Sequence, residues 1–226
     1  MRQRSHLDWA MMLVKGIRPE RNSYRHKNNV ITWKGVDGAR RFENRTDCSG
    51  FLNILLQQAH GFTPEYYQQW LNTRRPLART YHDTIVRKHG FTRIEQLDAT
   101  RSGDVIAIKY NNAQKGDNTG HLLLVVKTPK KRLPSAPLQE DTQQWEVVAI
   151  DSSRSGHGKN DTRRRPNGTF GSGVGQGVIR LYSDLGGEIV GYTWSTFLNS
   201  EFFPQSNRHL VIGRLDLQFH QLGKSR

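Results

Sequence analysis

The stretch RTDCSGFLNILL, residues 45–56, carries the clearest structural signal in the chain. Apolar residues four, three and four apart, counted from Cys48, share one helical face and predict a helix that ends just before Gly61. Thr46 or Asp47 can cap its first turn, and glycine is a common residue after a last turn. The single cysteine of the 226 residues therefore lies at the N-terminal end of an amphipathic helix.

Helical signals precede strand signals along the chain. Helical spacing and turn residues predict three further helices, over residues 6–17, 63–72 and 82–90. A short strand is expected at 30–33, and short apolar runs then predict about six strands, at 103–110, 121–126, 145–151, 177–182, 189–194 and 209–215. Helices followed by strands are typical of an α+β domain with an antiparallel sheet. The two long connections, 127–144 and 152–177, are expected to be lids or disordered insertions.

The composition indicates a basic globular protein. Lysine and arginine number 34 against 20 acidic residues, which gives a net charge of +14. Such a charge attracts polyanions such as nucleic acid, anionic lipid or an acidic cell-wall polymer, although scattered charge also simply maintains solubility. The basic residues form no aromatic-interleaved stripe and no zinc-finger spacing, which disfavours nucleic-acid binding. No apolar run has the length of a transmembrane helix, and no HExxH or His/Cys cluster predicts a metal or another cofactor.

The position of Cys48 suits a nucleophile. One cysteine cannot form an internal disulfide or a CxxC site, so cysteine usage does not identify the compartment. The unpaired N–H groups and the positive end of a helix stabilise a thiolate and supply donors to an oxyanion. Ser49 and Gly50 keep this turn small enough for a substrate to approach. A buried structural cysteine at a helix start is the alternative interpretation.

A thiolate nucleophile requires a base, and His121 is the candidate among nine histidines. It opens an apolar strand directly after Gly120, whereas most of the other histidines lie in polar stretches. Asp151 closes the next predicted strand. In an antiparallel sheet the end of one strand lies beside the start of its neighbour, so Asp151 could orient the imidazole. A solvent-facing histidine at a strand end is the alternative.

Four motifs, in order, resemble the NlpC/P60 superfamily of papain-like cysteine hydrolases: TDCSGF (46–51), GDVIAI (103–108), GHLLLVV (120–126) and VVAIDSS (147–153). The resemblance implies that Cys48 is the nucleophile, that His121 is the general base and acid, and that Asp151 orients the imidazole. The superfamily more often carries histidine at the third position. Asp104 or an asparagine elsewhere is therefore an alternative third member.

The resemblance also suggests residues that contact the substrate or its oxyanion. Tyr24 could correspond to an upstream tyrosine that helps to bind the oxyanion in this superfamily. Asp47 and Ser49 match the residues that flank the nucleophile. The backbone N–H of Cys48 is a further oxyanion donor.

The fold implied by the resemblance is a single α+β domain over residues 1–226, with a family-like core at about 45–155. In this papain-like NlpC/P60 fold, N-terminal helices and the helix of Cys48 pack on an antiparallel sheet of about five to six strands. The implied activity is amide hydrolysis through a thioester, without a cofactor. The expected substrate is a bacterial peptidoglycan stem peptide or another peptide or acyl compound. Such a protein would be periplasmic or secreted if a signal peptide has been removed, and no oligomeric state is indicated.

Two functions of other classes remain open. The chain could be a catalytically silent module that binds the cell wall and retains the hydrolase fold. It could also be a basic nucleic-acid-binding protein in which the cysteine is incidental.

Three further stretches have structural interpretations. GSGVGQG (171–177) does not fit a dinucleotide-binding fingerprint and predicts a flexible loop. The basic run 163–165 is expected to be solvated, with a substrate carboxylate as the alternative partner of its arginines. WSTFLN (194–199) is expected to be a piece of core helix.

Overall fold

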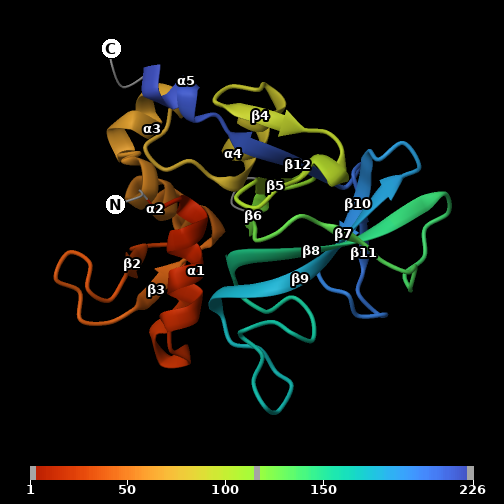
Figure 1. Cartoon of the computed structure of the whole chain (residues 1–226), viewed down its shortest axis with the longest axis horizontal. Coiled ribbons are helices and arrows are strands. Elements are labelled where there is room, and N and C mark those ends of the chain that lie inside the picture. Colours follow the sequence, from red (N-terminus) through yellow and green to blue (C-terminus); the bar gives the residue numbers. More distant parts are fainter. Residues whose placement is uncertain (1–3, 115–117, 223–226) are drawn as a thin grey trace.

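The chain forms a group of helices beside a large antiparallel sheet, as shown by a computed structural model that describes residues 4–114 and 118–222 (Figure 1). The α+β prediction is confirmed. The α-helices of the described residues are α1 (His6–Gly16), α2 (Cys48–His60), α3 (Pro64–Leu71), α4 (Ala78–Val86) and α5 (Leu217–Leu222). Within these residues, no helix is long and apolar enough to cross a membrane.

The large sheet has nine strands in the part of the chain that the structure describes. Their order is β11-β10-β9-β8-β6-β5-β12-β4, and β7 pairs beside β8. In chain order they are β4 (Phe91–Ile94), β5 (Val105–Tyr110), β6 (Gly120–Val125), β7 (Lys130–Lys131), β8 (Thr142–Ser153), β9 (Gly173–Asp184), β10 (Ile189–Thr193), β11 (Phe202–Pro204) and β12 (Arg208–Leu215). The expected sheet of five to six strands was too small, because the short strands β4, β7 and β11 carry little sequence signal.

A small second sheet leads into the helix of Cys48. It contains β1 (Asn22–Tyr24), β2 (Val30–Thr32) and β3 (Glu43–Thr46), with β3 in the centre. β1 runs parallel to β3 and pairs Tyr24 with Thr46, two residues before Cys48. The sheet therefore brings Tyr24 to the N-terminal end of α2.

Both faces of the central strands are buried. Alternate residues of β5 and β6 pack against the helices on one face, namely Val105, Ala107, Leu122 and Leu124. Their neighbours pack on the other face with β8, β9, β10 and β12, namely Ile106, Ile108, Leu123 and Val125. Because β10 and β11 also contact β12, the sheet curls around this second cluster. Burial on two faces explains why these strands are continuously apolar in sequence.

Most predicted elements are confirmed, and two are wrong. The helices at 6–17, 48–60 and 63–72 correspond to α1, α2 and α3, and Gly61 adopts the left-handed conformation after α2. The third predicted helix, α4, begins four residues early, at Ala78. Residues 194–199 are irregular rather than helical, because Ser195 receives side-chain and backbone hydrogen bonds that hold a turn. Residues 173–177 are the start of β9 rather than a flexible loop.

Candidate active site

The first turn of α2 is shaped by Asp47, its N-cap. Asp47 Oδ1 accepts hydrogen bonds from the backbone N–H of Gly50 at 2.7 Å and from the Ser49 hydroxyl at 3.1 Å. Asp47 Oδ2 forms an ion pair with Arg75 at 2.7 Å. The side chains of Asp47 and Ser49 are thus engaged with each other and with the turn, rather than presented to a substrate.

Cys48 follows this cap as the first residue of α2 and is buried, with an exposed fraction of 6%. The first N–H groups of a helix have no intrahelical acceptor. The Asp47 carboxylate accepts the hydrogen bond of the Gly50 N–H. The N–H groups of Cys48 and Ser49 are therefore the donors of this turn that could bind an oxyanion. The cysteine therefore combines a thiol with preorganised donors on a rigid element.

His121 is positioned by the close approach of β6 to β5. Gly120 has a φ of +155°, and a Cβ on it would lie 2.0 Å from the carbonyl oxygen of Ile108, so this position requires glycine. His121 Nε2 lies 2.6 Å from Asp151 Oδ2, and both side chains are buried. Because Nε2 donates to Asp151, Nδ1 is the nitrogen available to Cys48, which lies close enough for its charge to act on His121. The structure therefore brings together the three residues that the sequence proposed as a triad.

The surroundings of His121 favour its protonated form. Burial opposes protonation of His121, but the Cys48 charge and hydrogen bonds to Asp151 and Cys48 outweigh burial and raise the pKa of His121 to about 10. Burial likewise opposes ionisation of Asp151. Arg163 and His157 nevertheless hold the pKa of Asp151 well below its usual range. The His121 imidazolium thus lies beside an ionised Asp151.

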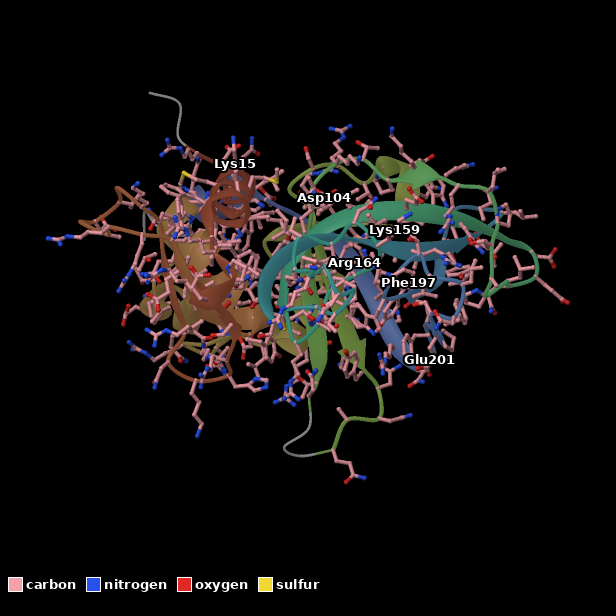
Figure 2. All side chains as sticks on the ribbon, turned by 90° about the horizontal axis from the view of Figure 1, so that it is seen from below. Lys15, Asp104, Lys159, Arg164, Phe197 and Glu201 are labelled. Atoms are coloured by element: carbon pink, nitrogen blue, oxygen red, sulfur yellow. The ribbon has the colours of Figure 1, made fainter. Side chains whose placement is uncertain are left out.

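Two basic side chains whose role the sequence did not indicate contact the same aspartate. His157 Nε2 lies 2.8 Å from Asp151 Oδ2, and Arg163 Nη2 forms an ion pair with Oδ1 at 2.9 Å. The expectation that Arg163 is solvated was wrong, since its exposed fraction is 6%. Its neighbour Arg164 is exposed, and Figure 2 shows Arg164 and Lys159 on the loop 154–172.

This loop is held in place by Asp161. Its carboxylate accepts hydrogen bonds from the backbone N–H groups of His157, at 2.7 Å, and Arg163, at 2.8 Å. It also pairs with the Arg163 guanidinium. Asp161 therefore fixes both residues that reach Asp151.

The alternating glycines 173, 175 and 177 explain how the loop can approach the sheet. They lie on one face of β9, because side chains alternate along a strand. A Cβ at Gly175 would lie 2.4 Å from Arg163 Nε, and one at Gly177 would lie 2.3 Å from Asp161 Oδ2. These glycines are spaced two residues apart, which is the repeat of a β-strand. This spacing was the sequence signal that could have predicted the start of β9.

A cavity of about 360 Å³ opens on this site. Three aromatic side chains and two imidazoles form much of its lining, namely Tyr24, Tyr110, Trp194, His121 and His157. Burial raises the pKa of Tyr24 and Tyr110, and the charge of Cys48 raises both further. The charge of Cys48 thus acts on three residues that line the cavity, Tyr24, Tyr110 and His121, so the thiol lies near it. Tyr24 keeps its proton at neutral pH and can donate it in a hydrogen bond.

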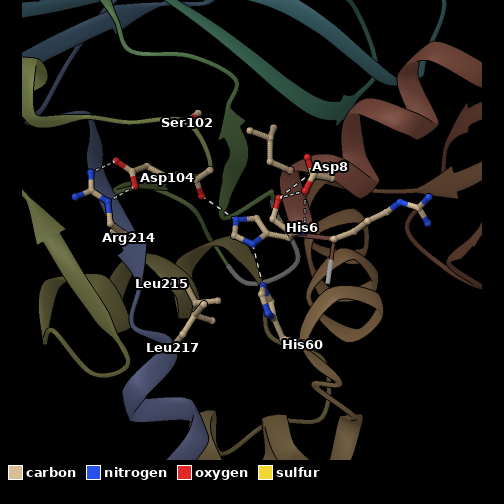
Figure 3. Close-up of a pocket in the computed structure, with 12 residues that line it drawn as sticks. His6, Asp8, His60, Ser102, Asp104, Arg214, Leu215 and Leu217 are labelled. Carbon is tan, nitrogen blue, oxygen red and sulfur yellow. Dashed lines mark hydrogen bonds and ion pairs between the residues drawn. The ribbon is translucent and has the colours of Figure 1, made fainter. Parts of the chain in front are cut away.

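Asp104, the alternative third member of the triad, belongs to a different pocket. It forms an ion pair with Arg214 at 2.8 Å beside a cavity of about 650 Å³ (Figure 3). In this pocket His6 Nδ1 lies 3.0 Å from His60 Nε2, and His6 Nε2 donates to the carbonyl of Gly103 at 2.8 Å. These contacts join α1 and α2 to the turn before β5.

The arrangement around Asp151 fits a hydrogen-bond network better than a metal centre. His121, Asp151 and His157 have possible ligand atoms within 4.8 Å of one another, the one such group in residues 4–114 and 118–222. Both imidazoles, however, already donate to Asp151 Oδ2. The Arg163 guanidinium on Oδ1 would also repel a metal cation.

Comparison with known proteins gives one relative along nearly the whole chain. An uncharacterized protein of Acanthamoeba polyphaga mimivirus is 35% identical over 221 residues, which cover 94% of this chain and 97% of the relative. No protein-family profile matches the chain, and no solved structure matches it. By identity and coverage, the chain belongs to the same protein family as this mimivirus protein.

Proposed function

We propose that the protein is a cysteine hydrolase that cleaves an amide bond, with the papain-like fold of the NlpC/P60 superfamily. One observation carries the proposal. A buried imidazole donates from one nitrogen to an ionised aspartate and lies close to Cys48, whose charge acts on it, at the start of a helix. This is the arrangement that activates a cysteine nucleophile.

The chemistry assigns one role to each group. The Cys48 thiolate attacks the carbonyl carbon, and the N–H groups of the first turn of α2 stabilise the oxyanion, with the Tyr24 hydroxyl as a further donor. His121 gives its proton to the leaving amine as the C–N bond breaks. Neutral His121 then accepts a proton from the water that hydrolyses the thioester and returns free Cys48.

The first substrate to test is a peptidoglycan stem peptide, as the superfamily resemblance implies. The aromatic lining suits an apolar or cyclic group next to the scissile carbonyl, and Arg154 adds a positive charge at the same cavity. The net charge of +14 would favour an anionic polymer as substrate.

The test compares the wild type with Cys48→Ala on purified peptidoglycan and on a panel of small amide and ester substrates, with fragments identified by mass spectrometry. We expect products from the wild type alone, unchanged by EDTA because the site needs no metal. Iodoacetamide labelling is unambiguous because Cys48 is the single cysteine. If Cys48 does not react with iodoacetamide at neutral pH and no substrate yields a product, the proposal is wrong. Wall binding without cleavage would support the silent module instead.

A further inference from the structure

We propose that His157 is a positioning residue that donates hydrogen bonds from both ring nitrogens and acts through Asp151 to limit the pH range over which His121 holds its proton. This inference rests on the proposed function and assigns a fourth member to its site. His157 lies on the loop 154–172, outside the four motifs of the superfamily.

The hydrogen-bond partners of His157 require its charged form. Its Nδ1 lies 3.0 Å from the carbonyl oxygen of Trp194, and its Nε2 lies 2.8 Å from Asp151 Oδ2. A carbonyl and an ionised carboxylate can only accept hydrogen bonds. A neutral imidazole has one N–H and would leave one of these buried contacts unmade, whereas an imidazolium donates to both.

Packing holds the ring in this position. The His157 imidazole stacks on the Trp194 indole, with ring centroids 5.5 Å apart and planes inclined by 20°. The same indole meets His121 edge-on, with centroids 5.1 Å apart. Trp194 therefore orients both imidazoles, and His157 has little freedom to rotate away from Asp151.

The charged groups around His157 come from three parts of the chain. Asp151 on β8 and His121 on β6 face its ring, and Arg163 of its own loop pairs with the other oxygen of Asp151. Asp161 accepts the backbone N–H of His157 and balances Arg163. Arg154 lines the same cavity. The positive charge of His157 thus offsets part of the Asp151 field that acts on His121.

This offset matters because His121 must release its proton to the leaving amine. A general acid works best when its pKa lies near the working pH. The pKa of His121 is already raised to about 10, and loss of the nearby positive charge would raise it further. The two ring centroids are 6.4 Å apart, so the shift should be about one pH unit in a partly screened site.

The experiment is a pH titration of the ¹⁵N-labelled histidine rings by NMR in the wild type, His157→Gln and His89→Gln. Glutamine can still donate to Asp151 but carries no charge, and exposed His89 is the matched control. We expect the His121 midpoint to rise by about one pH unit in His157→Gln and to stay unchanged in His89→Gln. Quenching of Trp194 fluorescence by the stacked imidazolium should also be lost in His157→Gln alone.

Different results would contradict the role of His157 and the proposed hydrolase activity. A His121 midpoint that is high in the wild type and unmoved in His157→Gln would overturn the role of His157 and leave the hydrolase intact. A wild-type His121 that titrates near 6.5 and does not respond to Cys48→Ala would instead remove the thiolate–imidazolium pair. If His157→Gln does not fold, the protonation state of His157 in the wild-type NMR spectrum tests the inference. A neutral His157 tautomer at pH 7 overturns the inference, and a doubly protonated ring supports it.

Discussion

At the scale of single residues, His121 links the chemistry of the site to the stability of the fold. The raised pKa of about 10 means that the native state binds the imidazole proton more tightly than the unfolded chain, whose histidines titrate near 6.5. The resulting stabilisation is fully present below about pH 6.5. It is lost as the pH rises through about 10, with a slope of at most about 1.4 kcal/mol per pH unit for one proton.

We therefore expect the free energy of unfolding of the wild type to fall more steeply between pH 7 and 10 than that of His121→Gln. Urea denaturation of both proteins across this range measures the difference, because the other titrating groups are common to both. Parallel curves would show that His121 is neutral in the native state.

At the scale of elements, the glycine-lined face of β9 determines whether the loop 154–172 can reach Asp151. Replacement of Gly177 by alanine would place a methyl group against Asp161 and the backbone of His157, at 2.3 Å and 2.8 Å. Asp161 cannot move freely because it holds two backbone N–H groups. We expect Gly177→Ala to lower stability by about 1–3 kcal/mol and to reduce hydrolysis.

The matched control is Gly171→Ala, since a Cβ at Gly171 would have its nearest neighbour at 3.7 Å. This variant should keep wild-type stability and activity. Thermal unfolding and product formation measure both. Equal effects of the two substitutions would mean that the glycine-lined face of β9 is not required for the loop 154–172 to pack on the sheet.

At the scale of the whole molecule, residues that follow the family-like core complete the sheet. β12 lies between β5 and β4, and β9 pairs with the whole length of β8. A fragment of residues 1–155 would retain every predicted triad residue but lose both strands. We expect this fragment to lack a cooperative thermal transition by circular dichroism, whereas the full chain shows one. A cooperative transition in the fragment would show that the core folds alone.

Features that depend on local sequence were predictable, whereas features that depend on contacts between distant segments were not. The helix of Cys48 could be predicted because its cap, apolar face and C-terminal glycine are all local. The pairing of His121 with Asp151 was suggested by strand order in an antiparallel sheet, with Asp104 or an asparagine as the alternatives. His157 and Arg163 could not be placed, because their positions depend on how a long polar loop folds back on β9. A charged side chain in such a loop is normally solvated. Arg163 is buried because it pairs with the buried carboxylates of Asp151 and Asp161, which the sequence does not show to be its neighbours.

The backbone pairing of this loop with β9 also has a consequence for synthesis of the chain. Val178 N donates to the carbonyl of His157, and Thr162 N donates to that of Gln176, so these contacts of the loop require β9. On the ribosome, Cys48, His121 and Asp151 emerge before His157 and Arg163, the residues that lower the pKa of Asp151. The nascent chain therefore carries Cys48, His121 and Asp151 in an unfinished site until the loop 154–172 and β9 have been translated.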